Sequence, residues 1–448
     1  MSAQTIFGTD GIRGRAGEGW LTEERAAQVG EALGHVLCAG IAAPKALLAH
    51  DGRRSGPPLE SAVARGLQTA GVECTSAGLL PTPGLAWLTR SGDYALGVML
   101  SASHNPAHDN GIKAFGAGGD KLSDDQQAAI EERLHGPAPA LQAGTPPTFL
   151  PSLEDAYLDH LVDTVSKGLD LSGVNLVLDC AHGAGSRVGP KVFGRLGAQV
   201  HAIGSDPDGE NINAAVGSTH PEALMDAVRG RGAQLGVALD GDGDRCMLVD
   251  SESDLVHGDG ILTVLGRHAA SSGKPEDQRL VATVMSNRGL HRALREVGVG
   301  VVEVGVGDRA VVEALRKETL SLGGEQSGHV VLGESNAFIG DGLVTALAVL
   351  RVMTASGKGL RELAAPYRPF PQVLINVPVA SKPQLSELPH ILAAVEEVER
   401  DLGEDGRVLL RYSGTEDLAR VMVEGPDAAV IQAHAERVAE LLVEAIGA

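Results

Sequence analysis

The sequence Ala95-Leu-Gly-Val-Met-Leu100, followed directly by Ser101-Ala-Ser-His-Asn-Pro106, decides the fold class of this chain. The first stretch carries no polar side chain, which is typical of a buried strand. The Asn-Pro pair that closes the second stretch predicts a loop, because a proline disfavours helical backbone in the residue before it. We therefore expect Ser103 at the end of a buried strand, with its hydroxyl group presented to solvent. A nucleophile or a phosphate carrier would be placed there.

The sequence around this stretch alternates strand-like and helical patterns. Apolar runs at residues 45–50 and 95–100 follow a helical pattern at residues 21–37, which predicts an α/β fold. A chain of 448 residues is too long for one hydrophobic core, so we expect roughly three or four domains.

Domain boundaries are predicted from composition. Residues 136–151 are rich in Pro, Gly, Ala and Thr and indicate a linker, and two prolines in residues 367–371 indicate a later boundary. The last segment has the order β-α-β-β-α, which predicts an antiparallel sheet with helices on one face. The predicted domains are 1–150, 151–255, 256–368 and 369–448.

Composition excludes several classes of partner. The net charge of −21 argues against binding nucleic acid or an anionic membrane surface. The four cysteines form no Cys-x-x-Cys pair, which suits a reducing compartment and argues against zinc or disulfide bonds. No apolar run reaches the length of a membrane span. We therefore expect a cytoplasmic protein.

An acidic loop, Asp240-Gly-Asp242-Gly-Asp244-Arg245, lies between two strand-like runs. Its glycines allow a tight turn, and three hard oxygen ligands at alternate positions predict a divalent cation site, most naturally for Mg²⁺. A calcium EF-hand is excluded because its sixth position is Arg245 and its twelfth is Ser251.

The acidic loop alone leaves a second interpretation open. In phosphatases of the haloacid dehalogenase type, a strand delivers a nucleophilic Asp and a second Asp acts as general acid, and Asp240 and Asp242 fit that description. Ser103 would distinguish the two interpretations, because a serine phosphate carrier makes an aspartyl phosphate unnecessary.

A phosphate site is predicted near the C-terminus. Arg411, Ser413, Gly414, Thr415 and Arg420 combine two guanidinium groups with two hydroxyl groups and a glycine amide. This is the donor set that a phosphate dianion favours.

Two further clusters are weaker when taken alone. Glu325, Ser327 and His329 lie in a glycine-flanked loop suited to binding sugar hydroxyl or amino groups. Arg13 lies beside two glycines as a possible phosphate contact, and Lys113 is ten residues beyond Ser103.

Residues 182–189 imitate a dinucleotide-binding motif, with Asp206 about twenty residues further on. The third glycine lies one position later than the dinucleotide-binding motif requires. A nicotinamide-dependent dehydrogenase would also leave Ser103 and the acidic loop without a role, so we set this interpretation aside.

Taken in order, these clusters resemble the α-D-phosphohexomutase superfamily over nearly the whole chain. The resemblance implies four domains around a central cleft: three related mixed α/β units and a smaller C-terminal α+β domain. It implies that Ser103 carries a phosphoryl group and that Asp240, Asp242 and Asp244 hold Mg²⁺ together with an oxygen of that phosphoserine. It assigns substrate binding to Arg245, Glu325, Ser327, His329, Arg411, Ser413, Gly414, Thr415 and Arg420.

Residues 7–14 and Gln326 resemble the members that interconvert glucosamine 6-phosphate and glucosamine 1-phosphate, with a hexose 1,6-bisphosphate as activator and a product that feeds UDP-N-acetylglucosamine synthesis. Members acting on mannose or glucose phosphates are the alternative, followed by a phosphatase using Asp240 and a non-catalytic sugar-phosphate-binding module. Lys113, Arg13, Asp308 and Arg309 are the candidates for acid–base work, and spacing does not rank them. The expected partner is a small sugar phosphate, with a homodimer as the candidate assembly.

Overall fold

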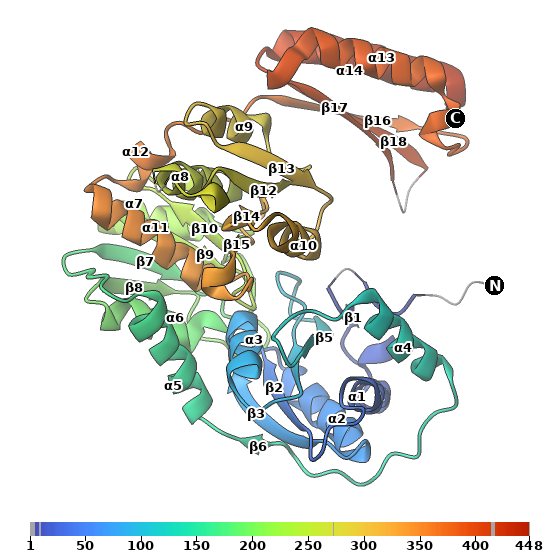
Figure 1. Cartoon of the computed structure of the whole chain (residues 1–448), viewed down its shortest axis with the longest axis vertical. Coiled ribbons are helices and arrows are strands. Elements are labelled where there is room, and N and C mark those ends of the chain that lie inside the picture. The colour runs from blue at the N-terminus through green and yellow to red at the C-terminus, as the bar shows by residue number, and fades with distance from the viewer. Residues whose placement is uncertain (1–4, 9, 272, 414–416, 448) are drawn as a thin grey trace. The chain divides into compact units, whose positions relative to one another are not determined.

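The computed structural model describes residues 5–8, 10–271, 273–413 and 417–447. Its contacts divide the chain into two compact units. The first unit comprises Met1–Val284 and Val302–Ala364, and the second comprises Met285–Val301 and Ala365–Ala448. Three sheets with covering helices belong to the first unit, and a small antiparallel sheet belongs to the second (Figure 1). The predicted α/β class with a smaller C-terminal α+β part is confirmed.

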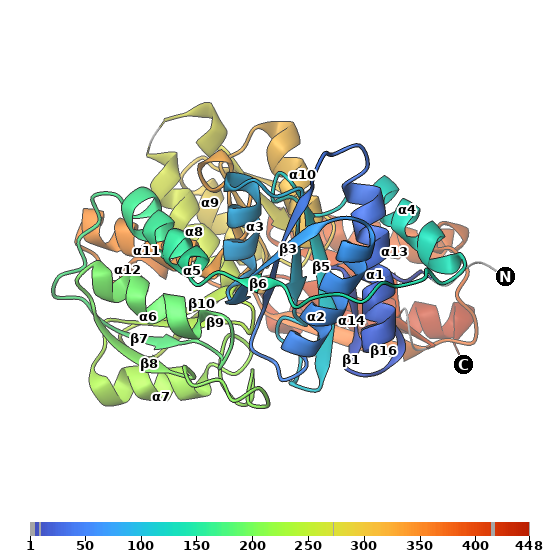
Figure 2. The same cartoon turned by 90° about the horizontal axis from the view of Figure 1, so that it is seen from below.

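The first sheet has the strand order β1-β5-β4-β2-β3-β6. Its strands are β1 (Ile12–Arg15), β2 (Lys45–His50), β3 (Glu73–Leu79), β4 (Leu96–Leu100), β5 (Asp109–Gly116) and β6 (Thr148–Phe149). Its helices are α1 (Glu23–Leu37), α2 (Gly56–Thr69), α3 (Thr82–Ser91) and α4 (Asp124–His135). Helices α1, α2 and α4 pack on the face that carries Leu48 and Val98. Figure 2 shows α1 and α2 side by side.

Two strands of this sheet position the site. β2 and β4 are parallel neighbours, so the residues that follow them, from Asp51 and from Ser101, emerge at the same edge. The predicted linker differs in one respect: its end forms β6, which pairs with β3 in parallel.

The second sheet has the order β11-β10-β9-β7-β8. Its strands are β7 (Asn175–Asp179), β8 (Gln199–Ile203), β9 (Leu235–Leu239), β10 (Cys246–Val249) and β11 (Leu255–Val256). The associated helices are α5 (Ser152–Asp159), which continues as a π-helix over His160–Val165, α6 (Gly185–Arg195) and α7 (Glu222–Arg231). The acidic loop joins β9 to β10, which pair antiparallel.

The third sheet has the order β13-β12-β14-β15. Its strands are β12 (Arg279–Thr283), β13 (Gly300–Val304), β14 (Leu322–Gly324) and β15 (Val330–Leu332). The helices of this part of the first unit are α8 (Gly258–Ala270), α10 (Asp308–Glu318), α11 (Gly342–Ser356) and α12 (Leu360–Ala364). The residues that join β14 to β15 are the predicted sugar loop.

The second unit contains the sheet β16-β18-β17. Its strands are β16 (Gln372–Pro378), β17 (Arg407–Tyr412) and β18 (Leu418–Glu424), and its helices are α9 (Arg288–Arg295), α13 (Pro389–Leu402) and α14 (Ala428–Ile446). Both strand pairs are antiparallel, as predicted. Glu424 anchors the Met285–Val301 segment here, because its carboxylate accepts the backbone N–H of Arg288 and pairs with Arg407. Among the described residues, no helix combines the length and apolar character needed to cross a membrane.

Candidate active site

Ser103 lies at the centre of the site, in the first unit. Its Oγ donates a hydrogen bond of 2.6 Å to Oδ2 of Asp240, and its backbone N–H donates to Oγ of Ser101. Its φ of 53° lies in the left-handed region, which is uncommon for a residue with a side chain. The predicted solvent exposure is wrong: Ser103 is 1% exposed, because the acidic loop covers it.

Arg53, which the sequence analysis missed, fixes the Ser103 loop. This fully buried side chain makes five hydrogen bonds. The acceptors are the carboxylate of Asp51 and the carbonyl oxygens of Ser103, Asn105, Pro106 and Asp109. Asn213, from the second sheet's region, also donates to the carbonyl of Ser103 over 2.9 Å. The sequence signal for Arg53 was available, since Asp51-Gly-Arg53 directly follows a buried strand.

The acidic loop brings its three carboxylates together. Asp240, Asp242 and Asp244 are buried, and each offers an oxygen within 4.8 Å of the others. Oδ1 of Asp242 and Oδ1 of Asp244 are buried without a hydrogen-bond partner in the described part of the chain. Burial, together with Asp244 and Asp242, raises the pKa of Asp240 well above its usual value. This hard, electron-rich oxygen set fits a divalent cation such as Mg²⁺.

Lys113 lies beside the acidic loop. Its ammonium group is 2.8 Å from Oδ2 of Asp242 and 2.8 Å from Oδ2 of Asp10. Burial alone would lower the pKa of Lys113, but Asp10 and Asp242 raise it above its usual value. Lys113 is therefore held as a cation, which suits charge stabilisation better than proton transfer.

Arg13 and Arg245 also supply positive charge. Arg13 pairs with Asp10, and Nε of Arg245 lies 3.9 Å from Oδ1 of Asp244. Burial lowers the pKa of His104, and the charges of Arg245 and Arg13 lower it further. Since His104 follows Ser103 directly, both guanidinium groups act electrostatically on the Ser103 loop.

The predicted sugar loop is joined to the acidic loop through the backbone. The N–H of Cys246 donates to the carbonyl of Gly328 over 3.0 Å. Oε1 of Glu325 accepts the N–H of Gly307, and Oγ of Ser327 has no hydrogen-bond partner among the residues described. His329 lies between two carboxylates, with Nδ1 3.9 Å from Asp244 and Nε2 3.9 Å from Asp308.

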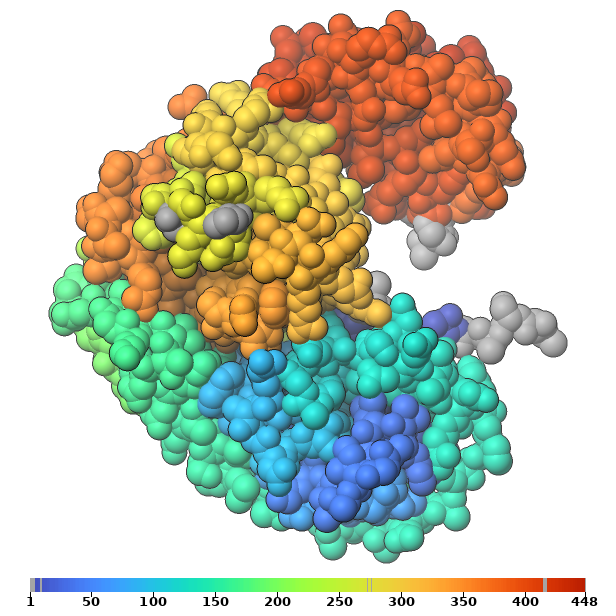
Figure 3. Space-filling view, in the orientation of Figure 1, coloured from blue at the N-terminus to red at the C-terminus, as the bar shows by residue number. Residues whose placement is uncertain are grey.

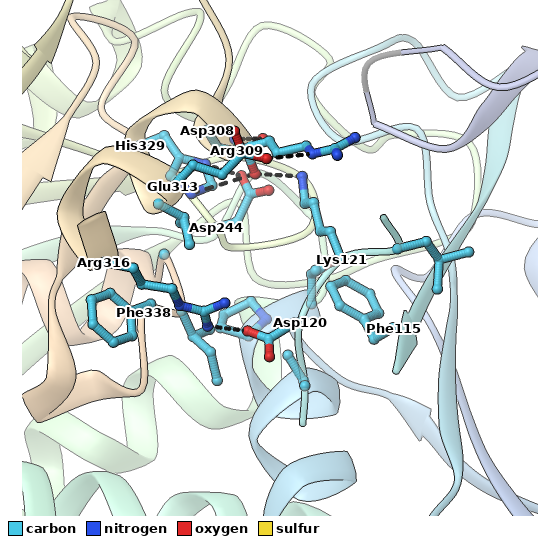
Figure 4. A pocket seen from close by; sticks show the side chains of 18 of the residues that line it. Phe115, Asp120, Lys121, Asp244, Asp308, Arg309, Glu313, Arg316, His329 and Phe338 are labelled. Atoms are coloured by element: carbon cyan, nitrogen blue, oxygen red, sulfur yellow. Dashed lines mark hydrogen bonds and ion pairs between the residues drawn. The ribbon is translucent and has the colours of Figure 1, made fainter. Parts of the chain in front are cut away.

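A cavity of about 280 Å³ extends from this cluster between the first and third sheets. Figure 4 shows Asp244 and His329 at one end and Phe115 and Phe338 at the other. Lys121, also missed by the sequence analysis, pairs with both Asp10 and Asp308. Lys121 therefore joins a sequence-predicted candidate, Asp308, to the opening segment of the chain.

The remaining acid–base candidate, Arg309, is engaged elsewhere. Its guanidinium pairs with Asp124 and with Glu313. Nearby on α10, Arg316 pairs with Asp120. In Figure 3 the cyan surface of the first sheet's region meets the gold surface of α10, the helix that carries Arg309 and Arg316.

The residues that imitate a dinucleotide motif have a structural role. A Cβ atom on Gly183 would lie 2.1 Å from the carbonyl oxygen of Gly241, and one on Gly185 would lie 2.6 Å from Cδ1 of Leu239. The N–H of Ala184 donates to that same Gly241 oxygen over 2.8 Å. These glycines bring the turn before α6 against the acidic loop.

In the second unit, Arg411 and Arg420 stand directly opposite each other on β17 and β18. Like charges at opposed positions destabilise a sheet unless an anion lies between them. The N–H of Ser413 donates to the carbonyl of Leu418. The predicted contacts Gly414 and Thr415 lie outside the described residues.

Comparison with known proteins agrees with this fold. Four family models match consecutive segments, described as phosphoglucomutase/phosphomannomutase alpha/beta/alpha domain I over residues 4–139, domain II over 155–253, domain III over 257–370 and the C-terminal domain over 374–441. The chain belongs to the phosphoglucomutase/phosphomannomutase family of enzymes.

Within that family, a phosphoglucosamine mutase of Rhodococcus erythropolis (strain PR4 / NBRC 100887) is 48% identical over 443 residues, covering 98% of this chain and 99% of that protein. Two solved structures share the fold. A phosphoglucomutase/phosphomannomutase family protein from Burkholderia thailandensis has a TM-score of 0.80 at 24% identity and covers 99% of this chain and 98% of its own. A putative phosphomannomutase from Thermus thermophilus has a TM-score of 0.77 at 26% identity, with coverage of 99% and 100%.

Proposed function

We propose that this chain is a phosphoglucosamine mutase, which interconverts glucosamine 6-phosphate and glucosamine 1-phosphate through a phosphoserine enzyme and a bisphosphorylated sugar. The observation that carries the proposal is the 2.6 Å contact between Oγ of Ser103 and Asp240 of the acidic loop. The full-length similarity to phosphoglucosamine mutases supports the choice of substrate. The reaction would take place in the cytoplasm, and its product would feed UDP-N-acetylglucosamine synthesis.

Ser103 is the proposed phosphoryl carrier. In the forward direction, the O1 hydroxyl of glucosamine 6-phosphate attacks the phosphorus of phosphorylated Ser103, the bond from phosphorus to Oγ breaks, and the hydroxyl proton is taken up in the site. Glucosamine 1,6-bisphosphate results. After the sugar turns over, Oγ of Ser103 attacks the phosphorus of the 6-phosphoryl group, the bond from phosphorus to O6 breaks, O6 takes the proton held in the site, and glucosamine 1-phosphate is released. The fixed Ser103 backbone keeps Oγ in one place for both transfers.

Asp240, Asp242 and Asp244 would hold Mg²⁺ together with an oxygen of the phosphoserine. Bound there, the ion supplies charge stabilisation to the transferring phosphoryl group. Lys113, Arg13 and Arg245 add fixed positive charge on the protein side. These cations are already paired with carboxylates, so the site needs little reorganisation when negative charge develops.

His329 and Asp308 are the proposed groups for moving the hydroxyl proton. Nε2 of His329 lies 3.9 Å from Oδ2 of Asp308. Burial raises the pKa of Asp308, but Lys121 and His329 lower it below its usual value. A carboxylate at that position would orient the imidazole and stabilise it when protonated.

The other contacts bind the two ends of the sugar. Glu325 and Ser327 would bind its hydroxyl and amino groups, while Arg411, Ser413, Gly414, Thr415 and Arg420 would bind its non-reacting phosphate. Each of the four predicted domains thus carries one of the predicted loops. Recognition of a phosphate rather than of one sugar face permits both orientations of the bisphosphate.

Phosphorus NMR tests the proposal. Purified protein with Mg²⁺ and a trace of glucose 1,6-bisphosphate is given glucosamine 6-phosphate, glucose 6-phosphate or mannose 6-phosphate in parallel. We expect preferential formation of glucosamine 1-phosphate, and loss of roughly 10⁴-fold or more in Ser103→Ala. Ser91→Ala, which removes an exposed hydroxyl bonded to the carbonyl of Trp87, is the matched control and should stay active.

The alternatives give different results in the same experiment. Preference for glucose or mannose phosphate would keep the mechanism and overturn the substrate. Release of inorganic phosphate without any 1-phosphate, persisting in Ser103→Ala, would overturn the mutase in favour of an aspartyl phosphatase.

A further inference from the structure

Thr82 binds the acidic loop at two points, although it lies 160 residues away in sequence. It is the first residue of α3 and is 5% exposed. Its Oγ1 donates to Oδ2 of Asp242 over 2.5 Å, and its backbone N–H donates to the carbonyl oxygen of Asp242 over 2.9 Å. One residue therefore fixes both the main chain and the side chain of this aspartate.

The two carboxylate oxygens of Asp242 have different surroundings. Oδ2 accepts from Thr82 and from Nζ of Lys113. Oδ1 is buried and has no hydrogen-bond partner within the described ranges. Burying a carboxylate oxygen without a hydrogen-bond partner costs free energy, so we expect a ligand to bind Oδ1. Asp240, Asp242 and Asp244 each offer one oxygen, and these three oxygens lie within 4.8 Å of one another, so a cation is the ligand that fits.

Lys113 also donates to Oδ2, but its ammonium group is shared between Asp242 and Asp10, 2.8 Å from each, so its contact is less specific to Asp242 than that of Thr82. Thr82 is branched at Cβ, which restricts its first side-chain torsion, and the helix holds its backbone. The hydroxyl of Thr82 is therefore the contact that sets which oxygen faces inward.

We propose that Thr82 is a positioning residue for Asp242: it holds Oδ2 so that Oδ1 faces the cation bound by the three aspartates. This inference rests on the metal role given to the acidic loop in the proposed function. It also means that α3, from the first sheet's region, sets the geometry of a ligand from the second.

The helix offers a matched control. Thr89 lies on α3 too, is 0% exposed, and donates from Oγ1 to the carbonyl of Leu85 over 2.8 Å. Thr82→Val and Thr89→Val each replace a buried hydroxyl by a methyl group of similar size. Thr82→Ser keeps the hydroxyl and serves as the conservative variant.

Calorimetric titration of the purified, metal-free proteins with Mg²⁺ gives a readout that does not depend on turnover. We expect Thr82→Val to bind Mg²⁺ about 10- to 100-fold more weakly than wild type. Thr82→Ser and Thr89→Val should stay within about threefold of wild type, because both leave the contact to Asp242 in place. Turnover of Thr82→Val should recover at high Mg²⁺, which a misfolded variant would not do.

Two results would overturn the inference, and they are distinguishable. Equal Mg²⁺ affinity in Thr82→Val and Thr89→Val would show that Thr82 does not position Asp242, while a wild type that binds Mg²⁺ and interconverts the sugar phosphates would leave the proposed function intact. A wild type that binds no Mg²⁺ would remove the metal role itself, and with it both proposals.

Discussion

Gly183→Ala adds one methyl group next to the acidic loop, and the backbone displacement that it causes can be worked out from the structure. The added Cβ would lie 2.1 Å from the carbonyl oxygen of Gly241, where real Cβ contacts do not fall below 3.0 Å. The two backbones must therefore separate by at least the difference, 3.0 − 2.1 = 0.9 Å. Gly241 lies between Asp240 and Asp242, so the shift moves candidate metal ligands relative to Ser103.

A displacement of about 1 Å in a catalytic arrangement can cost about 10²-fold in rate. We expect Gly183→Ala to lower kcat by about 10- to 100-fold and to raise the Mg²⁺ concentration needed for half-maximal activity. The assay is the steady-state rate of glucosamine 1-phosphate formation across a Mg²⁺ series. Circular dichroism of the same samples checks that the chain is folded.

Gly194→Ala is the matched control, because it lies on α6 and an added Cβ meets nothing within 4 Å. Replacing a helical glycine with alanine should stabilise the protein by about 0.5–1 kcal/mol and leave kcat unchanged. If Gly183→Ala showed the same kcat and the same Mg²⁺ requirement as Gly194→Ala, the argument from close backbone packing would be refuted.

Three other predictions concern different parts of the chain. Arg53→Lys keeps the charge but loses the planar fork, so turnover should fall by at least about tenfold, whereas the exposed Arg54→Lys should have no effect on the same assay. Burial raises the pKa of Glu60 to about 7, above its ordinary value, so its contribution to stability is present below about pH 4.5 and is lost as the pH rises through 7. In urea unfolding, Glu60→Gln should therefore gain about 3 kcal/mol over wild type at pH 8 and under about 1 kcal/mol at pH 5, and an equal difference at both pH values would contradict this. Arg411→Gln should raise the KM for glucosamine 6-phosphate about 10- to 100-fold, while the same change at the exposed Arg400 of α13 should not; unchanged KM in both would remove Arg411 from the proposed phosphate site.

Sequence analysis located the candidate residues that belong to short motifs. The acidic loop and Ser103 each follow an apolar strand, so local pattern was enough to locate them. The exposure of Ser103 was predicted wrongly, because covering by the acidic loop is a contact over 137 residues. Arg53 binds the Ser103 loop across a separation of 50 residues in sequence. Periodicity reveals an element and its buried face, but it does not reveal which distant partner the polar ends will meet.

Arg309 and the glycines of residues 182–189 show that a sequence pattern can also suggest a functional role where the structure shows a structural one. Arg309 fits a site by composition, yet its guanidinium is paired with Asp124 and Glu313. The glycine pattern suggested a cofactor, yet the close approach it allows is to the protein's own backbone at Gly241. Only the positions of the neighbours distinguish these cases.

The grouping of Met285–Val301 with the C-terminal part affects how the chain can be dissected. The polypeptide passes from one unit to the other after residues 284, 301 and 364, so no single cut separates the two. A fragment ending at residue 364 would keep Asn287 but lose Phe370, with which it exchanges two hydrogen bonds. A fragment beginning at residue 365 would keep Glu424 without the α9 N–H that it accepts. Isolating the C-terminal unit therefore requires a redesigned connection that carries residues 285–301 along with it.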